Sequence, residues 1–314
     1  MVVLSVVWQK ARKTMKIKHA IRNELRRELS DPQCILLGED VASPQGGAFG
    51  VTKGLVNEFP TQVLNTPISE QAITGLAIGL ALNGHKIILE IMMGDFLTLC
   101  LDQLLNHMSK IPEMYGKRID LPIVIRTPMG GRRGYGPTHS QSLERFFVGI
   151  PNIKVYAINR ETYFLGLYKP QRTPQIVFEY KTLYEQDIVL KNNYIYPYSD
   201  MTIFTYGEML REVLDAIGNK TTTDIICPTR IFPLAGDVLF DSVRKTGKLL
   251  TVEEGTPFAS IGAEAIAQCA ERGILKKAMR LGNDGIVPCS MKLENEVLPG
   301  RKDIIEAVKR LASE

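Results

Sequence analysis

Glu70 stands where a carboxylate can act as an acid or a base, just ahead of the apolar run 72–82. Pro67 ends a short strand predicted at 62–65, and Ser69 is a favourable N-cap for a helix. We therefore expect Glu70 in the first helical turn. A carboxylate at this position can also do no more than complement the helix dipole, which is worth about 0.3–1 kcal/mol. The pattern alone leaves both interpretations open.

A second candidate site is the loop 126–141, which follows a buried-looking strand and is crowded with glycine and proline. Such a loop has little room for core packing and leaves its polar groups available for a ligand. His139, one of four histidines in the chain, lies in it. A lone loop histidine is often a structural group, but open parallel sheets bind ligands at the carboxyl ends of their strands. His139 is therefore a candidate for function.

Composition excludes several classes of protein. With 314 residues, 45% hydrophobic and 23% charged, the chain has the balance of a globular protein. The net charge of +4 and the dispersed basic residues give little support to nucleic-acid binding. Five widely spaced cysteines without a Cys-x-x-Cys pair argue against a disulfide framework or a zinc site and favour a reducing compartment. No signal peptide or membrane span is convincing, so we expect a cytoplasmic protein with no membrane partner, and 1–14 as an N-terminal extension.

Alternating strand and helix patterns predict an α/β fold of parallel sheets covered by helices, in two three-layer domains. The first set has strands at 35–38, 87–91, 122–126, 154–157 and 176–179, and helices at 51–59, 70–82, 95–110, 143–148 and 160–168. The second has strands at 202–206, 224–227 and 249–253, and helices at 208–217, 237–245, 262–272 and 302–311. Residues 181–200 lose this periodicity. We expect domains at 15–190 and 191–314.

Several motifs in order carry a family resemblance from about residue 15 to the end. They are LLGEDV (36–41), TPISE (66–70), EIMMGDF (90–96), DQ (102–103), RTP (126–128), HSQ (139–141), TYG (205–207), RIFPL (230–234), SVRKTG (242–247) and VEEG (252–255). The chain resembles the beta subunits of the thiamine-diphosphate-dependent 2-oxoacid dehydrogenases, which act on pyruvate, branched-chain 2-oxo acids or acetoin. The resemblance implies a transketolase-like pyrimidine-binding domain followed by a transketolase C-terminal domain.

The resemblance also implies roles for individual residues. Glu70 matches the glutamate that hydrogen-bonds the ring nitrogen of the cofactor's aminopyrimidine and favours its imino tautomer. Phe96 matches the aromatic residue on which the pyrimidine stacks, although an ordinary core phenylalanine is the alternative. Ile68 and Ser69 would shape the pyrimidine pocket. His139 matches a histidine that lines the entrance and donates a hydrogen bond or a proton to the substrate.

The resemblance implies that this chain carries only half of the cofactor site. In similar enzymes a Gly-Asp-Gly segment, followed by an asparagine, holds the diphosphate and Mg²⁺, whereas Gly94-Asp95-Phe96 has phenylalanine at the third place. The resemblance therefore implies an alpha subunit that carries the diphosphate and Mg²⁺ site, in an alpha2-beta2 assembly. Gly75 and Gly79 share a helix face and would allow close helix packing there.

The predicted reaction is decarboxylation of a 2-oxo acid and transfer of the acyl group to the lipoyl arm of a core acyltransferase. Two alternatives are a transferase that forms an acyloin or modifies a sugar with a separate alpha subunit, and a non-catalytic scaffold subunit. Arg132 and Arg133 stand where similar enzymes carry small or neutral residues, so either can bind a second anionic group of the substrate beside Tyr135. The alternative is that the two arginines are solvated or form salt bridges with the partner subunit. Lysine and arginine in the loop 169–173, where similar enzymes bind a monovalent cation, make that cation site doubtful.

Overall fold

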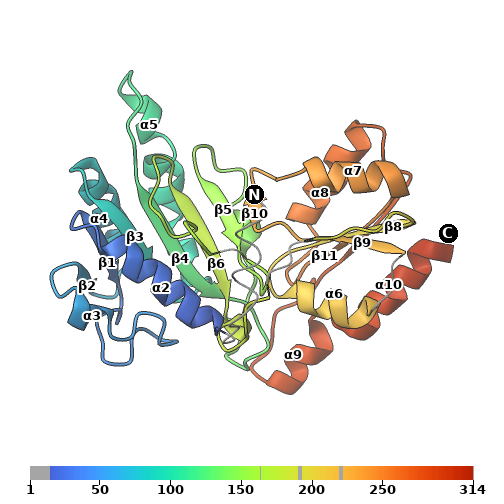
Figure 1. Cartoon of the computed structure of the whole chain (residues 1–314), viewed down its shortest axis with the longest axis horizontal. Coiled ribbons are helices and arrows are strands. Elements are labelled where there is room, and N and C mark those ends of the chain that lie inside the picture. Colours follow the sequence, from blue (N-terminus) through green and yellow to red (C-terminus); the bar gives the residue numbers. More distant parts are fainter. Residues whose placement is uncertain (1–14, 163, 190–192, 219–221, 314) are drawn as a thin grey trace, which may run out of the picture.

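The computed structural model describes residues 15–162, 164–189, 193–218 and 222–313. Two helix-covered sheets lie side by side (Figure 1). The expected extension, 1–14, falls outside the described residues. Among the described helices, none is long and apolar enough to cross a membrane.

The N-terminal sheet has the strand order β10-β5-β6-β4-β3-β1-β2. Its strands are β1 (Cys34–Gly38), β2 (Val63–Asn65), β3 (Lys86–Glu90), β4 (Ile123–Met129), β5 (Lys154–Ala157), β6 (Gln175–Tyr180) and β10 (Arg230–Phe232). The first six run parallel, whereas β10 comes from the C-terminal half and pairs antiparallel with β5. Helices α2 (Ile17–Leu29) and α4 (Glu70–Leu82) pack against β1, and α4 also packs against β3.

The second sheet has the order β12-β11-β8-β9-β7. Its strands are β7 (Asn193–Tyr194), β8 (Met201–Thr205), β9 (Thr223–Ile226), β11 (Lys248–Val252) and β12 (Lys277–Leu281), all parallel except β7. Helices α7 (Asp237–Thr246) and α8 (Ile261–Glu271) cover one face, and α6 (Met209–Ile217) and α10 (Arg301–Ser313) cover the other (Figure 1). Helix α9 (Met291–Val297) lies toward the N-terminal sheet.

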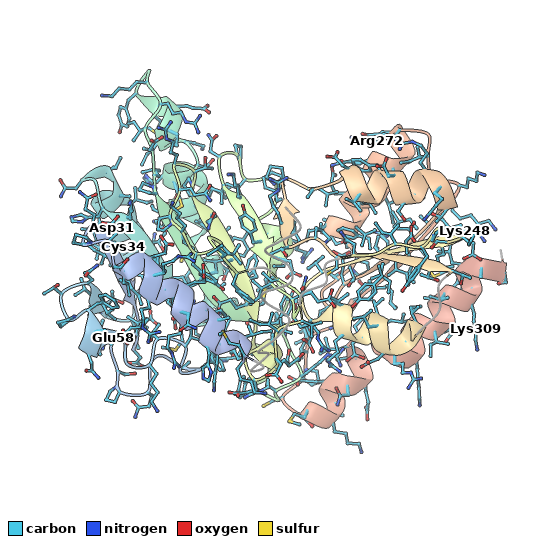
Figure 2. All side chains as sticks on the ribbon, in the orientation of Figure 1. Asp31, Cys34, Glu58, Lys248, Arg272 and Lys309 are labelled. Carbon is cyan, nitrogen blue, oxygen red and sulfur yellow. The ribbon has the colours of Figure 1, made fainter. Side chains whose placement is uncertain are left out.

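Side chains fill the space between the two sheets (Figure 2). One hydrophobic cluster contains Phe178 of β6 and also Phe204 of β8, so the two halves share a core. All seven residues of β4 and all six of β6 are buried, as expected for the central strands of a parallel sheet. Gly38 pairs with Glu90 and Met129 with Tyr180, which brings the carboxyl ends of four strands to one edge.

The predicted fold class is confirmed, but four predicted helices differ. Segment 51–59 is helical only in α3 (Leu55–Glu58), and 143–148 only in the 3-10 turn η3 (Glu144–Phe146). Segment 95–110 contains the 3-10 helix η1 (Phe96–Cys100) and the π-helix η2 (Gln103–Met108), and the chain continues into the short α5 (Ile111–Met114).

The helix predicted at 160–168 is wrong for the described residues of that segment, which form turns. Asn159 accepts the N–H of Glu161 at 2.7 Å, and its own N–H is bonded to the Thr162 hydroxyl at 2.8 Å. Side chains that bond the nearby backbone in this way compete with helix formation. Gly166, with φ of +80°, also departs from helical geometry. The short strands β7 and β10 and the regular strand β12 were not predicted.

Candidate active site

Glu70 is the first residue of α4 and is buried, with 8% of its surface exposed. Ser69 occupies the N-cap position, as predicted, but its side chain makes no capping hydrogen bond. Within the first turn, the hydroxyl of Thr74 donates a hydrogen bond to the backbone oxygen of Glu70 at 2.7 Å. The sequence therefore places the carboxylate correctly at a helix N-terminus, where the helix dipole favours negative charge.

Glu39 provides a second buried carboxyl group beside Glu70. It follows β1 directly and is 4% exposed. Burial raises the pKa of Glu39, and the nearby Glu70 raises it further, while an interaction with the backbone of Ser69 opposes the shift. One carboxyl oxygen, Oε1, is buried without a hydrogen-bond partner among the described residues. A polar group from outside the chain would satisfy this oxygen.

Phe96 and His139 meet at the same edge of the sheet. Their ring centroids lie 5.2 Å apart and the ring planes are inclined by 77°. The Nδ1 atom of His139 lies 2.8 Å from the hydroxyl of Thr138, so Nε2 is left for another partner. Phe96 opens η1 and is partly buried. The structure thus brings together two residues that are far apart in sequence and that the resemblance had assigned to one site.

Lys181 is a further buried group at this edge, with 1% exposure. Its Nζ donates a hydrogen bond to the backbone oxygen of His139. Neither Lys181 nor Glu39 was predicted as a site residue. Both are charged residues that directly follow a buried strand, β6 and β1 respectively, and that position was the available signal.

An ion triad beneath the site joins three strand ends. Arg126 of β4 donates to Glu179 of β6 at 2.8 and 2.5 Å and also contacts Glu90 of β3. Tyr168 and Tyr184 each donate to Glu179 at 2.7 Å. Burial raises the pKa of Glu90 to about 7, although Arg126 opposes the shift. Because all the charges are buried and partnered, we assign this triad to the support of the strand ends.

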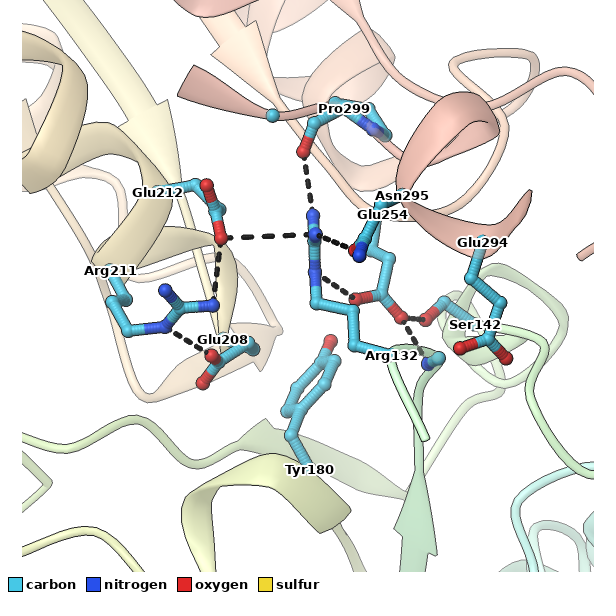
Figure 3. Close-up of polar contacts among 12 residues, drawn as sticks. Arg132, Ser142, Tyr180, Glu208, Arg211, Glu212, Glu254, Glu294, Asn295 and Pro299 are labelled. Carbon is cyan, nitrogen blue, oxygen red and sulfur yellow. Dashed lines mark hydrogen bonds and ion pairs between the residues drawn. The ribbon is translucent and has the colours of Figure 1, made fainter. Parts of the chain in front are cut away.

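Arg132 contacts the C-terminal half of the chain (Figure 3). Its guanidinium donates to the backbone oxygen of Pro299 at 2.7 Å and to Asn295 at 3.4 Å. Carboxylate oxygens of Glu212 and Glu254 lie 3.8 and 3.9 Å away. Its backbone is left-handed, with φ of +66°. The guanidinium of Arg132 is therefore bonded within the chain, to partners in the C-terminal half that the sequence did not predict.

Arg133 and Tyr135 lie on the exposed side of the same loop. The guanidinium carbon of Arg133 is 5.8 Å from the centroid of the Tyr135 ring, and Nη2 is 3.4 Å from the Tyr135 hydroxyl. The Nζ of Lys181 is 5.4 Å from the same ring. Tyr135 therefore lies between an exposed arginine and the lysine that is bonded to His139. Ile68, in contrast, is 81% exposed and is not enclosed by this chain.

The described residues contain no group of three or more His, Cys, Asp or Glu side chains that could hold a metal ion. The Cys residues are all free thiols, and Cys289 is exposed.

Comparisons with known proteins agree with the fold and the motifs. Residues 13–186 match the protein family described as "Transketolase, pyrimidine binding domain", and residues 191–304 match the family described as "Transketolase, C-terminal domain". The chain is 32% identical to the acetoin:2,6-dichlorophenolindophenol oxidoreductase subunit beta of Cupriavidus necator, covering 94% of this chain and 97% of the relative. It is 34% identical to the pyruvate dehydrogenase E1 component subunit beta of Gracilaria tenuistipitata var. liui, covering 93% and 97%.

A solved structure titled split gene transketolase, inactive beta4 tetramer, superimposes with a TM-score of 0.75 at 17% identity, covering 94% of this chain and 98% of that chain. This likeness supports the fold. The two matched regions together span most of the sequence, and the relatives align over nearly their full length. The chain belongs to the transketolase-like family that includes the beta subunits of pyruvate dehydrogenase E1 and of the acetoin oxidoreductases.

Proposed function

We propose that this chain holds the pyrimidine half of thiamine diphosphate in an enzyme that decarboxylates a 2-oxo acid and transfers the acyl group. The observation that carries the proposal is the buried carboxylate of Glu70 at the start of α4, beside Glu39 with its unpartnered Oε1. An aminopyrimidine presents both ring nitrogen and exocyclic N–H groups, which fit these two carboxyl groups. The partly buried ring of Phe96 fits a stacked heterocycle.

Each residue has a distinct role in this proposal. Glu70 holds the proton shared with the pyrimidine ring nitrogen, and burial beside Glu39 keeps water from competing for it. Ile68 and Ser69 border the pyrimidine, and Phe96 orients it. When bound, thiamine diphosphate supplies the carbon nucleophile that attacks the 2-oxo group. His139 donates a hydrogen bond or a proton to the substrate oxygen.

The partner in this proposal is an alpha subunit that carries the diphosphate and Mg²⁺ site in an alpha2-beta2 assembly. Support comes from the outer face of α4, where Leu76 and Leu82 are each 49% exposed. Apart from the adjoining residues and the backbone of the helix itself, no atom of the described residues lies within 4 Å of a Cβ built on Gly75 or Gly79, so a second helix can approach this face closely. Ile68, at the edge of the proposed pocket, is also uncovered. Exposed apolar surface of this kind is typical of a protein interface.

The substrate proposal rests on Arg133. Because Arg132 is held by the C-terminal half, Arg133 beside Tyr135 is the better placed of the two to meet a second anionic group. A dicarboxylic or phosphorylated 2-oxo acid would then be preferred to pyruvate. Arg133→Ala should lower kcat/KM for such a substrate by the worth of one ion pair, about 2–5 kcal/mol, and spare pyruvate. An equal loss for both would exclude this role. The five cysteines are all free thiols, which is typical of a reducing compartment, so we also propose a cytoplasmic location.

Reconstitution with the co-expressed alpha subunit tests the proposed reaction. The assembled enzyme should acylate a lipoyl domain from one or more 2-oxo acids, whereas the isolated chain should bind thiamine diphosphate weakly. Product formed only with an aldehyde acceptor would favour the acyloin-forming or sugar-modifying alternative. Failure of the co-expressed pair to bind the cofactor would favour the scaffold alternative. Tight, Mg²⁺-dependent binding to the isolated chain would contradict the shared site.

A further inference from the structure

Lys181 is buried at the candidate site, and the proposed chemistry does not use it. It follows β6 directly and opens the short 3-10 helix η4 (Lys181–Leu183). Its 1% exposure is unusual, because lysine is almost never fully buried unless its ammonium is paired. A buried lysine therefore needs partners that offset its desolvation. Those partners show what the residue does.

The amine of Lys181 contacts the active-site loop at two places. Its Nζ donates to the backbone oxygen of His139 and lies 5.4 Å from the ring centroid of Tyr135. Gly136 lies between Tyr135 and His139, and Gly134 directly precedes Tyr135; both glycines have positive φ. Such backbone has little intrinsic preference for one conformation. External contacts such as these must therefore fix where the imidazole lies.

Asp95 supplies a charge of opposite sign near Lys181. Its Oδ1 accepts the backbone N–H of Gln141 at 3.4 Å, and the next residue, Phe96, packs against the imidazole. Burial lowers the pKa of Lys181 to about 8, and attraction to Asp95 is the largest effect that opposes the fall. The peptide carbonyl of His139 thus faces an ammonium, and the N–H two residues later faces a carboxylate.

Charged groups of both signs also act on the pKa of Lys181. Glu254 and Glu294 also favour its protonated form, whereas Arg133 opposes it. No carboxylate of the described residues forms an ion pair with Lys181 within 4.0 Å. The directed contact of the amine is therefore the peptide oxygen of His139.

We propose that Lys181 is a positioning residue that holds the backbone of His139, so that the imidazole stays against Phe96 and faces the substrate. Asp95 makes the buried ammonium tolerable and restrains the following peptide. The importance of His139 for catalysis rests on the proposed function, but its position can be measured without that function.

The decisive experiment measures how fast diethyl pyrocarbonate modifies each histidine of the full-length chain, by peptide mass spectrometry. The chain has four histidines, so His19, His85 and His107 are internal references. Lys181→Met keeps most of the side-chain volume but removes the donor. Release of the loop should speed modification of His139 by about fivefold or more and leave the references within about twofold. Lys169→Met, at an exposed lysine in another loop, should change none of the four rates.

A double variant separates positioning from simple charge compensation. Asp95→Asn combined with Lys181→Met leaves a neutral pair with an acceptor still available to Gln141. If Lys181 positions His139, the double variant stays as reactive at His139 as Lys181→Met. A return to the wild-type rate would show that Lys181 only neutralises Asp95 and would overturn the proposal. An unchanged His139 rate in Lys181→Met would overturn it as well.

Lys181→Arg tests whether misfolding explains faster modification of His139 in Lys181→Met, because arginine keeps a charged donor at this position. It should restore at least part of the protection of His139. In the reconstituted enzyme, Lys181→Met should lower kcat about tenfold or more, with KM and the exchange of the cofactor's thiazolium proton within about twofold. Loss of proton exchange would place Lys181 in cofactor binding and contradict the role. Inactivity of the wild-type enzyme would contradict the proposed function and leave the modification result valid.

Discussion

The imidazole of His139 meets the ring of Phe96 edge to face, with 5.2 Å between the centroids. This contact joins the loop after β4 to the 3-10 helix η1, which follows β3. The proposed pyrimidine platform and the proposed substrate donor therefore share one wall of the site.

His139→Ala should impair substrate conversion more than cofactor activation. Loss of a general acid or a donor to the substrate typically costs about 10²–10⁴ in rate. Exchange of the thiazolium proton should stay close to that of the wild type, because Glu70 is intact. Single-turnover acyl transfer and proton exchange in the reconstituted enzyme check this. His107→Ala, at an exposed histidine, is the matched control; equal loss of proton exchange in His139→Ala would contradict the assignment.

Arg132→Ala should destabilise the fold, whereas Arg133→Ala should not. The first change removes the donor to Pro299 and the cation that lies within 4 Å of Glu254, whereas Glu212 keeps its ion pair with Arg211 at 2.7 Å. Loss of a hydrogen bond that involves a charged group costs about 1.5–3 kcal/mol. An exposed change such as Arg133→Ala should stay within about 0.5 kcal/mol. Urea unfolding of both variants measures the difference, and equal midpoints would show that Arg132 does not fasten the loop.

Glu144 should make the protein less stable as the pH rises. It is 1% exposed, and burial raises its pKa to about 7. A raised carboxyl pKa means that the folded state binds the proton more tightly, so this contribution is complete below the unfolded pKa of about 4.5 and is lost as the pH rises through 7. The full effect is on the order of 3 kcal/mol.

Thermal unfolding of the wild type and of Glu144→Gln between pH 5 and pH 8.5 measures this effect. The amide mimics the neutral carboxyl group, so the variant should gain stability relative to the wild type above pH 7. The pKa of Glu253, which faces the same cluster, is also raised by burial, so the variant should keep part of the slope. Parallel curves for the two proteins would exclude Glu144 as the titrating group.

The sequence predicted most of the fold because its parallel strands are apolar runs bounded by turns. The strand predicted at 154–157 is found at Lys154–Ala157, and the helix predicted at 70–82 is found at Glu70–Leu82. The helix at 160–168 failed because Asn159 and Thr162 bond the backbone locally, which a periodicity of apolar residues does not reveal.

The sequence predicted the places of Glu70, at a helix start, and of His139, in a loop after a strand, whereas their roles stay predictions. The contacts of Arg132 could not be predicted from the sequence, because Pro299 and Glu212 lie far from it in sequence and only the packing of the two halves brings them together. Lys181 was missed for the same reason. It lies in a stretch that the pattern interpreted as a polar boundary, yet its amine points back into the core.

The central claim is that Glu70 controls the proton of the cofactor's pyrimidine, and the exchange rate of the thiazolium C2 proton measures it most directly. In the enzyme reconstituted with its alpha subunit, Glu70→Gln should slow this exchange by at least about 10²-fold, because an amide cannot replace the carboxyl group in acid-base work. Glu58→Gln, at an exposed glutamate, should leave the rate unchanged. Near-normal exchange in Glu70→Gln, with cofactor bound and the fold intact, would contradict the account.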